Sequence, residues 1–234
     1  MPDKHLSTQF DSELNAVSSR VMELGGLVEA QIRQAIDALS NWNPSSARQV
    51  LEVEAKVNKI EVEIDRDISS IIGRRQPTAR DLRLLMAISK ITANLERAGD
   101  ETEKIARMVL AILEAGKPHS LPSSEIQFEA ELSSGLLRKA LDAFARLDSK
   151  TAVTIMKEDQ LIDREFDGFL RKLITYMMED PRTIGASLDL LFIAKALERI
   201  GDHAKNVAEL IIYVVYGADV RHISIAEIEN KLAN

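Results

Sequence analysis

Two copies of one short motif hold the side chains in this sequence that are best suited to chemistry. Residues 95–100 read LERAGD, and residues 197–202, which lie 102 positions further on, read LERIGD. In each copy a Glu and an Asp stand four positions apart, which places both carboxylates on one face of a helix, about one turn apart. Each copy also has a Gly inside a predicted helix, where Gly costs on the order of 1 kcal/mol relative to Ala. The combination indicates close approach by a metal ion, an ordered water or another backbone.

Apolar residues at steps of three and four predict six long helices that carry these motifs. Their approximate ranges are 8–41, 45–74, 78–115, 125–147, 149–179 and 181–217. Ser45 or Ser46 is expected to cap the second helix, and Pro181 suits the first turn of the sixth. The apolar stripe of the sixth helix lies 102 residues beyond that of the third, so the chain is a tandem repeat of a three-helix unit.

The repeat predicts an all-α fold of two three-helix bundles. The first bundle is expected to cover residues 8–115 and the second residues 125–217. Residues 116–124, rich in Pro and Ser, are the expected linker, and the tail 218–234 is expected to contain one short helix.

Composition narrows the class of protein. The 234 residues are 45% hydrophobic and 29% charged, with a net charge of −7 and no cysteine. Disulfides and thiolate metal sites are therefore excluded, and nucleic acid is not an expected partner because no Lys or Arg run exceeds two residues. The N-terminus lacks the apolar core of a signal peptide, and the most apolar stretch is too short to span a bilayer. These features predict a cytoplasmic protein.

Folding the helices back on one another predicts one group of oxygen ligands in each repeat. A turn near residue 76 brings helix two level with the first motif, and a turn near residue 180 brings helix five level with the second. Carboxylate and amide oxygens suit hard cations, so iron, Mg²⁺, Mn²⁺ and Zn²⁺ are the candidate metals. The predicted ligands are Glu54, Asn58, Glu96 and Asp100 in the first repeat, and Asp159, Asp163, Glu198 and Asp202 in the second.

Some neighbouring groups stay open at this point. Glu61 is a doubtful further ligand, and Asp65 and Asp167 are expected to lie too close to the turns. His203 could be a ligand or a solvated side chain. The alternative for the whole pattern is a solvated acidic face whose carboxylates pair locally with Arg97 and Arg199.

Three stretches together resemble the PhoU family of phosphate-uptake regulators. They are residues 75–83 (RQPTARDLR), the two LER motifs, and residues 216–222 (YGADVRH). The resemblance implies two three-helix bundles related by a pseudo-two-fold axis, with metal ions bound at the surface by Glu/Asp-x-x-x-Asp motifs. Those motifs map onto Glu96–Asp100, Glu198–Asp202 and Asp159–Asp163. The corresponding pair Glu54–Asn58 has one charge fewer, so the first site is expected to bind less tightly.

The resemblance also implies a function. Members of the family are cytoplasmic negative regulators that couple a phosphate ABC transporter to the sensor histidine kinase of a two-component system. A homodimer is expected, and any association with the membrane would be peripheral, through these partners. The alternative is a metal-dependent hydrolase or redox enzyme with a multinuclear carboxylate site. The sequence offers no general base distinct from the ligands, which favours a protein that is not an enzyme.

Overall fold

The computed structural model describes residues 8–116 and 124–233, and within these ranges it contains helices and no strand. Most of the predicted linker, 116–124, lies outside the described residues. None of the described helices is both long and apolar enough to cross a membrane. The helices are α1 (Thr8–Asn41), α2 (Pro44–Arg75), α3 (Ala79–Glu114), α4 (Ser124–Arg146), α5 (Ser149–Glu179), the 3-10 turn η2 (Pro181–Thr183), α6 (Ile184–Tyr216) and α7 (Ile225–Ala233).

The helix starts differ from the prediction at two places. Pro181 lies in the 3-10 turn η2, and α6 itself begins at Ile184. Asn43, rather than Ser45 or Ser46, caps α2, and its side-chain oxygen accepts hydrogen bonds from both serine amides at 2.9 and 3.4 Å. Pro44 follows this cap in the first turn of α2, where proline is tolerated because the first helical position needs no amide donor. Asp148 caps α5 in the same way. The two caps are therefore equivalent positions of the two repeats, separated by 105 residues.

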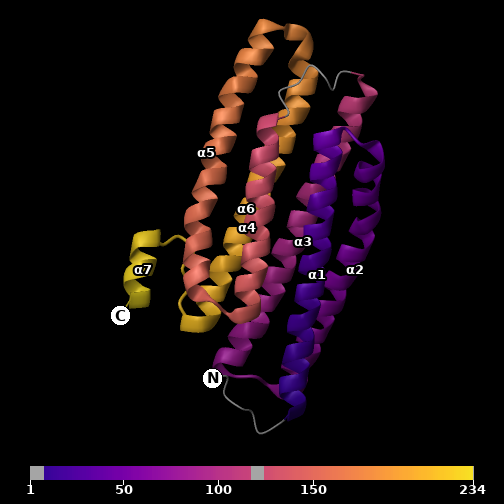
Figure 1. Ribbon diagram of the computed structural model, residues 1–234. Coiled ribbons are helices and arrows are strands. Elements are labelled where there is room, and N and C mark those ends of the chain that lie inside the picture. The colour runs from indigo at the N-terminus through magenta and orange to yellow at the C-terminus, as the bar shows by residue number, and fades with distance from the viewer. Residues whose placement is uncertain (1–7, 117–123, 234) are drawn as a thin grey trace.

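The two three-helix bundles lie side by side with their long axes roughly parallel (Figure 1). Helices α1 to α3 form one antiparallel bundle and α4 to α6 the other, and α3 and α6 make the most extensive helix contact between them. The short helix α7 stands beside α5, apart from both bundles, and is anchored by the fully buried Ile228. The motif helices α3 and α6 are thus central.

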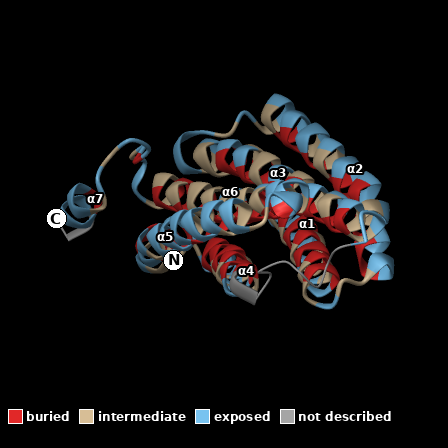
Figure 2. Ribbon diagram, turned by 90° about the horizontal axis from the view of Figure 1, so that it is seen from above, coloured by how far each residue is buried: buried red, intermediate tan, exposed pale blue. Residues whose placement is uncertain are grey.

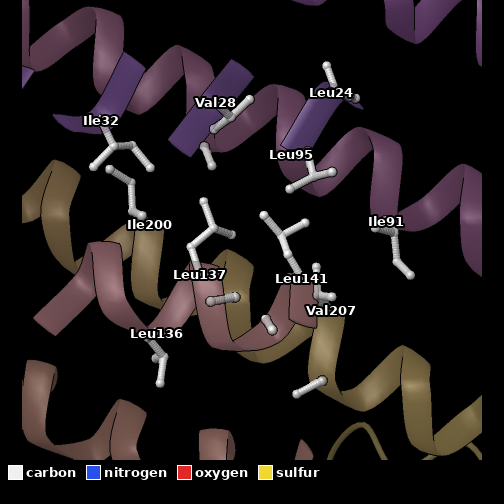
Figure 3. Packing of buried hydrophobic residues seen from close by; sticks show 14 of the residues in the cluster. Leu24, Val28, Ile32, Ile91, Leu95, Leu136, Leu137, Leu141, Ile200 and Val207 are labelled. Atoms are coloured by element: carbon white, nitrogen blue, oxygen red, sulfur yellow. The ribbon is translucent and has the colours of Figure 1, made fainter. Parts of the chain in front are cut away.

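One hydrophobic core runs through both bundles. Buried residues line the inward faces of the helices, and exposed residues cover the outer faces (Figure 2). Leu24 and Val28 of α1 lie opposite Leu137 and Leu141 of α4, so the core continues across the boundary between the repeats (Figure 3). Gly25 permits this approach, because a Cβ at that position would lie 2.4 Å from Leu141 Cδ2. Fully burying each such Leu contributes roughly 1.5–3 kcal/mol, so the repeats stabilise each other.

Equivalent positions in the two repeats have two offsets. The offset is 102 residues from α3 to α6, and 105 residues from α1 to α4 and from α2 to α5, as the helix ends and caps require. Buried positions coincide in this alignment, for example Ile32 with Leu137. Among the buried positions at which polarity is exchanged, Leu24 is replaced by Glu129, and Gln31 is replaced by Leu136.

Candidate functional site

Six side chains on α2 and α3 form what we call the first acidic site. They are Glu54, Asn58 and Glu61 on α2, and Glu96, Asp100 and Glu103 on α3. Burial raises the pKa of Glu96 to about 6, and repulsion from Asp100, Glu61 and Glu54 adds to this effect. Burial also raises the pKa of Glu61, with Asp65 and Asp100 contributing. Glu61, which the sequence left doubtful, therefore faces the motif carboxylates.

Glu54 is the most buried carboxylate of this site, with 9% of its surface exposed. Gln31 on α1 donates from Nε2 to Glu54 Oε2 at 3.1 Å, whereas Glu54 Oε1 is buried and has no partner. Burial raises the pKa of Glu54 against the effect of the Gln31 hydrogen bond, and Asp100 and Glu103 raise it further. A neutral amide thus supports a carboxylate that lacks a charged partner.

Gly99 lies where α3 passes close to two polar side chains. A Cβ at this position would lie 3.3 Å from Gln31 Oε1 and 3.5 Å from Glu54 Oε2. The missing side chain lets α3 pass close to the Gln31–Glu54 pair, which puts Glu96 and Asp100 beside it. The close approach is therefore by polar side chains of two neighbouring helices.

Of the five carboxylates in the first acidic site, only Glu103 has an ion-pair partner among the described residues. Within the described ranges, no Lys or Arg nitrogen lies within ion-pair distance of Glu54, Glu61, Glu96 or Asp100. Arg97 acts only at longer range, where it lowers the pKa of Glu61 and Glu96 slightly against the larger effects. Glu103 pairs with Arg107 at 2.5 Å along α3. The local pairing of motif acids with Arg97 is therefore wrong.

Four carboxylates and one ammonium group form what we call the second acidic site. They are Asp159 and Asp163 on α5, and Glu198, Asp202 and Lys205 on α6. Asp159 is only 1% exposed, and Lys205 Nζ lies 2.9 Å from its Oδ2. Burial raises the pKa of Asp159 despite the opposing effect of Lys205. Burial lowers the pKa of Lys205, but the hydrogen bond and charge of Asp159 outweigh it and raise the pKa overall.

Gly201 has the same role here as Gly99 in the first repeat. A Cβ on Gly201 would lie 2.7 Å from Ile162 Cδ1 and 3.2 Å from Asp159 Oδ1. Asp159 and Glu54 are both buried. The glycines allow the helices to pack so closely that these two side chains are covered.

A second lysine and an unpredicted buried carboxylate adjoin the second acidic site. Lys195 Nζ lies 2.7 Å from Glu198 Oε1 and 5.0 Å from the centre of the Phe166 ring. Glu129 on α4 is 1% exposed, and neither of its oxygens has a hydrogen-bond partner. Burial raises the pKa of Glu129 to about 8, with Glu198 and Glu165 adding to the shift. The one sequence signal for Glu129 is its place on an apolar stripe.

An open cleft of about 460 Å³ between α3 and α6 separates the two sites, and Asp100 and Asp202 line it from opposite sides. Arg199 reaches across it to Glu101 Oε1 at 3.2 Å, so it does not pair with the carboxylates of its own motif. His203 is half-buried, and its Nδ1 lies 3.1 Å from Asn94 Oδ1 on α3. Burial lowers the pKa of His203. The structure gives this histidine a hydrogen bond between the repeats.

The remaining predicted positions lie at the edges of the sites. Asn58 and Asp163 are exposed, as is Asp167. Asp65 accepts a hydrogen bond from Ser89 at 3.0 Å, nearer the α2–α3 turn than the motif.

Among residues 8–116 and 124–233, no group of three or more His, Asp or Glu side chains is arranged to hold a metal ion as it stands. The donors still fit a hard cation, because Glu54 Oε1 is buried and unpartnered beside further carboxylates; binding would require the side chains to close.

Comparison with known proteins gives consistent full-length matches. The PhoU domain model matches residues 21–109 and 127–211. A phosphate-specific transport system accessory protein PhoU homolog of Burkholderia sp is 48% identical over 225 residues, covering 96% of each chain. The Escherichia coli K12 accessory protein PhoU is 45% identical over 231 residues, covering 99% of this chain and 95% of its own.

Two solved structures have the same fold. The crystal structure of PhoU from Pseudomonas aeruginosa superposes with a TM-score of 0.87 at 42% identity, covering 89% of this chain and all of that one. The phosphate transport system regulatory protein PhoU from Streptococcus pneumoniae superposes with a TM-score of 0.84 at 26% identity, covering 90% of this chain and 99% of that one. The tandem repeat predicted from the sequence thus has solved counterparts.

Proposed function

Because both repeats match the PhoU domain, this chain belongs to the PhoU family, and we propose that it is a regulatory accessory protein of phosphate uptake. The observation that carries the proposal is the end-to-end similarity to proteins named as accessory proteins of the phosphate-specific transport system.

The proposed role is negative regulation in the cytoplasm. The protein contacts components of a phosphate ABC transporter and the sensor histidine kinase of the phosphate two-component system, and it acts as a homodimer. Support for the transporter comes from the names of the relatives. Support for the kinase, the cytoplasmic location and the dimer comes from the resemblance to the family.

We further propose that hard cations bind at the acidic sites. The support is chemical: each site gathers carboxylates from two helices, and buried oxygens there have no partner, as at Glu54 and Glu198. A bound cation would supply positive charge and hold the two helices together. Because it binds the folded chain, it would stabilise the fold, by about 2.7 kcal/mol at a concentration of 100 times Kd.

Deletion of the gene tests the regulatory role. In phosphate-rich medium the deletion strain should express phosphate-starvation genes at high level, and the intact gene should restore repression. Pull-down of the tagged protein from membranes should recover transporter and kinase subunits. Normal starvation-gene expression in the deletion strain contradicts the proposal.

Turnover of generic phosphoesters distinguishes the regulator from a metal-dependent hydrolase. We expect no turnover by the purified protein with Mn²⁺ or Mg²⁺ above that of a variant lacking the motif carboxylates, Glu96→Gln with Asp100→Asn and Glu198→Gln with Asp202→Asn. Turnover that disappears in that variant supports the enzyme instead.

A further inference from the structure

We propose that the first acidic site is the cation site of this chain, and that Lys205 is a built-in counterion that takes the place of a cation in the second. This inference rests on the metal binding proposed above. It reverses the ranking expected from the sequence, in which Asn58 made the first site the weaker one.

The equivalence of the repeats shows where the charges differ. Position 103 on α3 corresponds to position 205 on α6, so Glu103 is replaced by Lys205, a change of two charge units. Ala93 is likewise replaced by Lys195, which pairs with Glu198. On α2 and α5 the offset of 105 replaces Glu61 with Phe166. These three exchanges make the second site less acidic than the first, whereas the replacement of Asn58 by Asp163 and of Arg107 by Glu209 acts in the opposite direction.

Counting charged groups gives the size of the difference. The first acidic site has five carboxylates, Glu54, Glu61, Glu96, Asp100 and Glu103, and one basic group, Arg107, is paired to Glu103. The second acidic site has four, Asp159, Asp163, Glu198 and Asp202, with Lys205 and Lys195 paired to two of them. Each ammonium group within about 4 Å opposes binding of a cation by Coulomb repulsion and removes a carboxylate from the ligand set.

The contact of Lys205 blocks the deepest ligand of the second site. Lys205 Nζ lies 2.9 Å from Oδ2 of Asp159, the carboxylate that is 1% exposed. A cation that coordinates Asp159 must displace this ammonium group and leave it in a largely buried position, since the Lys205 side chain is 33% exposed. The same ammonium supplies the charge compensation that a cation would otherwise provide.

The equivalent ligand of the first site is unobstructed. Glu54 takes one hydrogen bond from neutral Gln31, and its other oxygen, Oε1, is buried without a partner. Gln31 is replaced by Leu136 in the second repeat, where Lys205 supports the carboxylate instead. Glu54 is nine-tenths buried and is influenced by both Asp100 and Glu103, so its free oxygen belongs to the site.

Exchanging one charge between the repeats tests the proposal. Mn²⁺ is titrated into the full-length protein by calorimetry, and bound Mn²⁺ is counted by the loss of the free-ion EPR signal. The variants are Glu103→Lys, which gives the first repeat the charge of the second, and Lys205→Glu, which does the reverse. Glu23→Lys and Lys150→Glu are the matched controls, because they make the same charge changes at exposed positions on α1 and at the start of α5.

We expect Glu103→Lys to weaken the tightest Mn²⁺ binding by about tenfold or more, the effect of one added like charge in a partly buried site. Lys205→Glu should add a second equivalent of bound Mn²⁺ with affinity within about tenfold of the first. The two controls should each change affinity by less than about threefold, because exposed charges are screened. Glu96→Gln with Asp100→Asn should abolish the binding in the wild-type background, a check that is independent of the lysine substitution.

Other outcomes overturn the proposal in different ways. If wild-type Mn²⁺ binding survives Glu103→Lys and Glu96→Gln with Asp100→Asn but is lost in Glu198→Gln with Asp202→Asn, the cation prefers the second site. The inference then fails while the proposed metal binding stands. If neither wild type nor Lys205→Glu binds Mn²⁺, the proposed metal binding fails, and the inference fails with it. Melting in chelator and far-UV circular dichroism establish that each variant is folded.

Discussion

Both repeats bury a carboxylate beside a close helix crossing, but different side chains support that carboxylate in each. In the first repeat a neutral amide from α1, Gln31, supports Glu54 and leaves one oxygen unpartnered. In the second an ammonium group from α6, Lys205, pairs with Asp159. The backbone geometry that brings the groups together is shared, since a glycine permits the crossing in both. Duplication has therefore preserved the scaffold while the charge balance diverged.

The exchange of Leu24 for Glu129 extends the contrast to the core. Leu24 packs between α1 and α4, whereas its equivalent, Glu129, places an unpartnered carboxyl group at a position of the same burial. A buried, unpartnered carboxylate is costly, so Glu129 takes up a proton more readily than an exposed Glu does. The second repeat thus has the ammonium group of Lys205, paired with Asp159, and the buried acid Glu129. The following experiments separate the effects of these two groups.

The largest effect is expected from Lys205→Met, which keeps the aliphatic stem and removes the charge. Asp159 then remains buried without a partner, and the free energy of unfolding at pH 7.5 should fall by about 2–4 kcal/mol, somewhat less than for a fully buried pair. The loss should shrink as the pH falls, because burial raises the pKa of Asp159 and protonation removes its buried charge. Urea unfolding followed by circular dichroism measures both values, and Lys150→Met at an exposed position is the control. Equal stability of the two variants would show that the ion pair contributes little.

A smaller change of opposite sign is expected from Glu129→Leu, which restores the residue type of the first repeat. Because the folded-state pKa of Glu129 is raised to about 8, its carboxyl group is protonated in the folded protein at pH 5. The stability that this pKa shift contributes is present below the unfolded pKa and is lost as the pH rises through 8. The variant should be more stable than wild type at pH 8.5, by about 1–3 kcal/mol, with less difference at pH 5.

Glu131→Leu, at an exposed position two residues further along α4, is the control for that experiment. It removes the same charge from the same helix, but it should change the free energy of unfolding by no more than about 0.5 kcal/mol at either pH. If Glu129→Leu shows no pH dependence relative to this control, the carboxyl group is solvated at high pH and the assigned burial is wrong.

The smallest effect is expected from Glu96→Gln in the first acidic site. The folded-state pKa of Glu96 is raised to about 6, so its contribution to stability is lost between about pH 4.5 and 6 in the absence of cations. Wild type in chelator should therefore lose about 0.5–1 kcal/mol over this range that the variant does not lose, a value reduced for partial solvent screening. Melting at pH 4.5 and 7 measures the difference, and Glu52→Gln on the exposed face of α2 is the control. If the stability of Glu96→Gln and of wild type depends on pH in the same way, the raised pKa of Glu96 is wrong.

Periodicity in the sequence was sufficient to predict the long helices and their repetition. Apolar residues at steps of three and four report which face of a helix is buried, and that information is local. The 102-residue recurrence of the two motifs likewise predicted Glu96, Asp100, Glu198 and Asp202, with a glycine beside each pair, as candidate ligands. The cap of α2 was predicted two or three residues too late, because Asn43, Ser45 and Ser46 are all competent caps and only the local backbone selects one.

The tertiary structure alone decided how charges pair between helices. Arg199 lies beside the acids of its own motif in sequence, yet it pairs with Glu101 on α3, because α3 and α6 cross where their motifs meet. Lys205 reaches Asp159 because the turn between Glu179 and Ile184 sets the height of α6 against α5, and neither helical pattern specifies that height. Burial of Glu129 depends on how the two repeats share one core. A periodic pattern gives the direction of each side chain around its own helix. Pairing also depends on the height of each residue along the helix axis, on the angle at which the helices cross and on the length of the side chain, and packing between the helices determines how these combine.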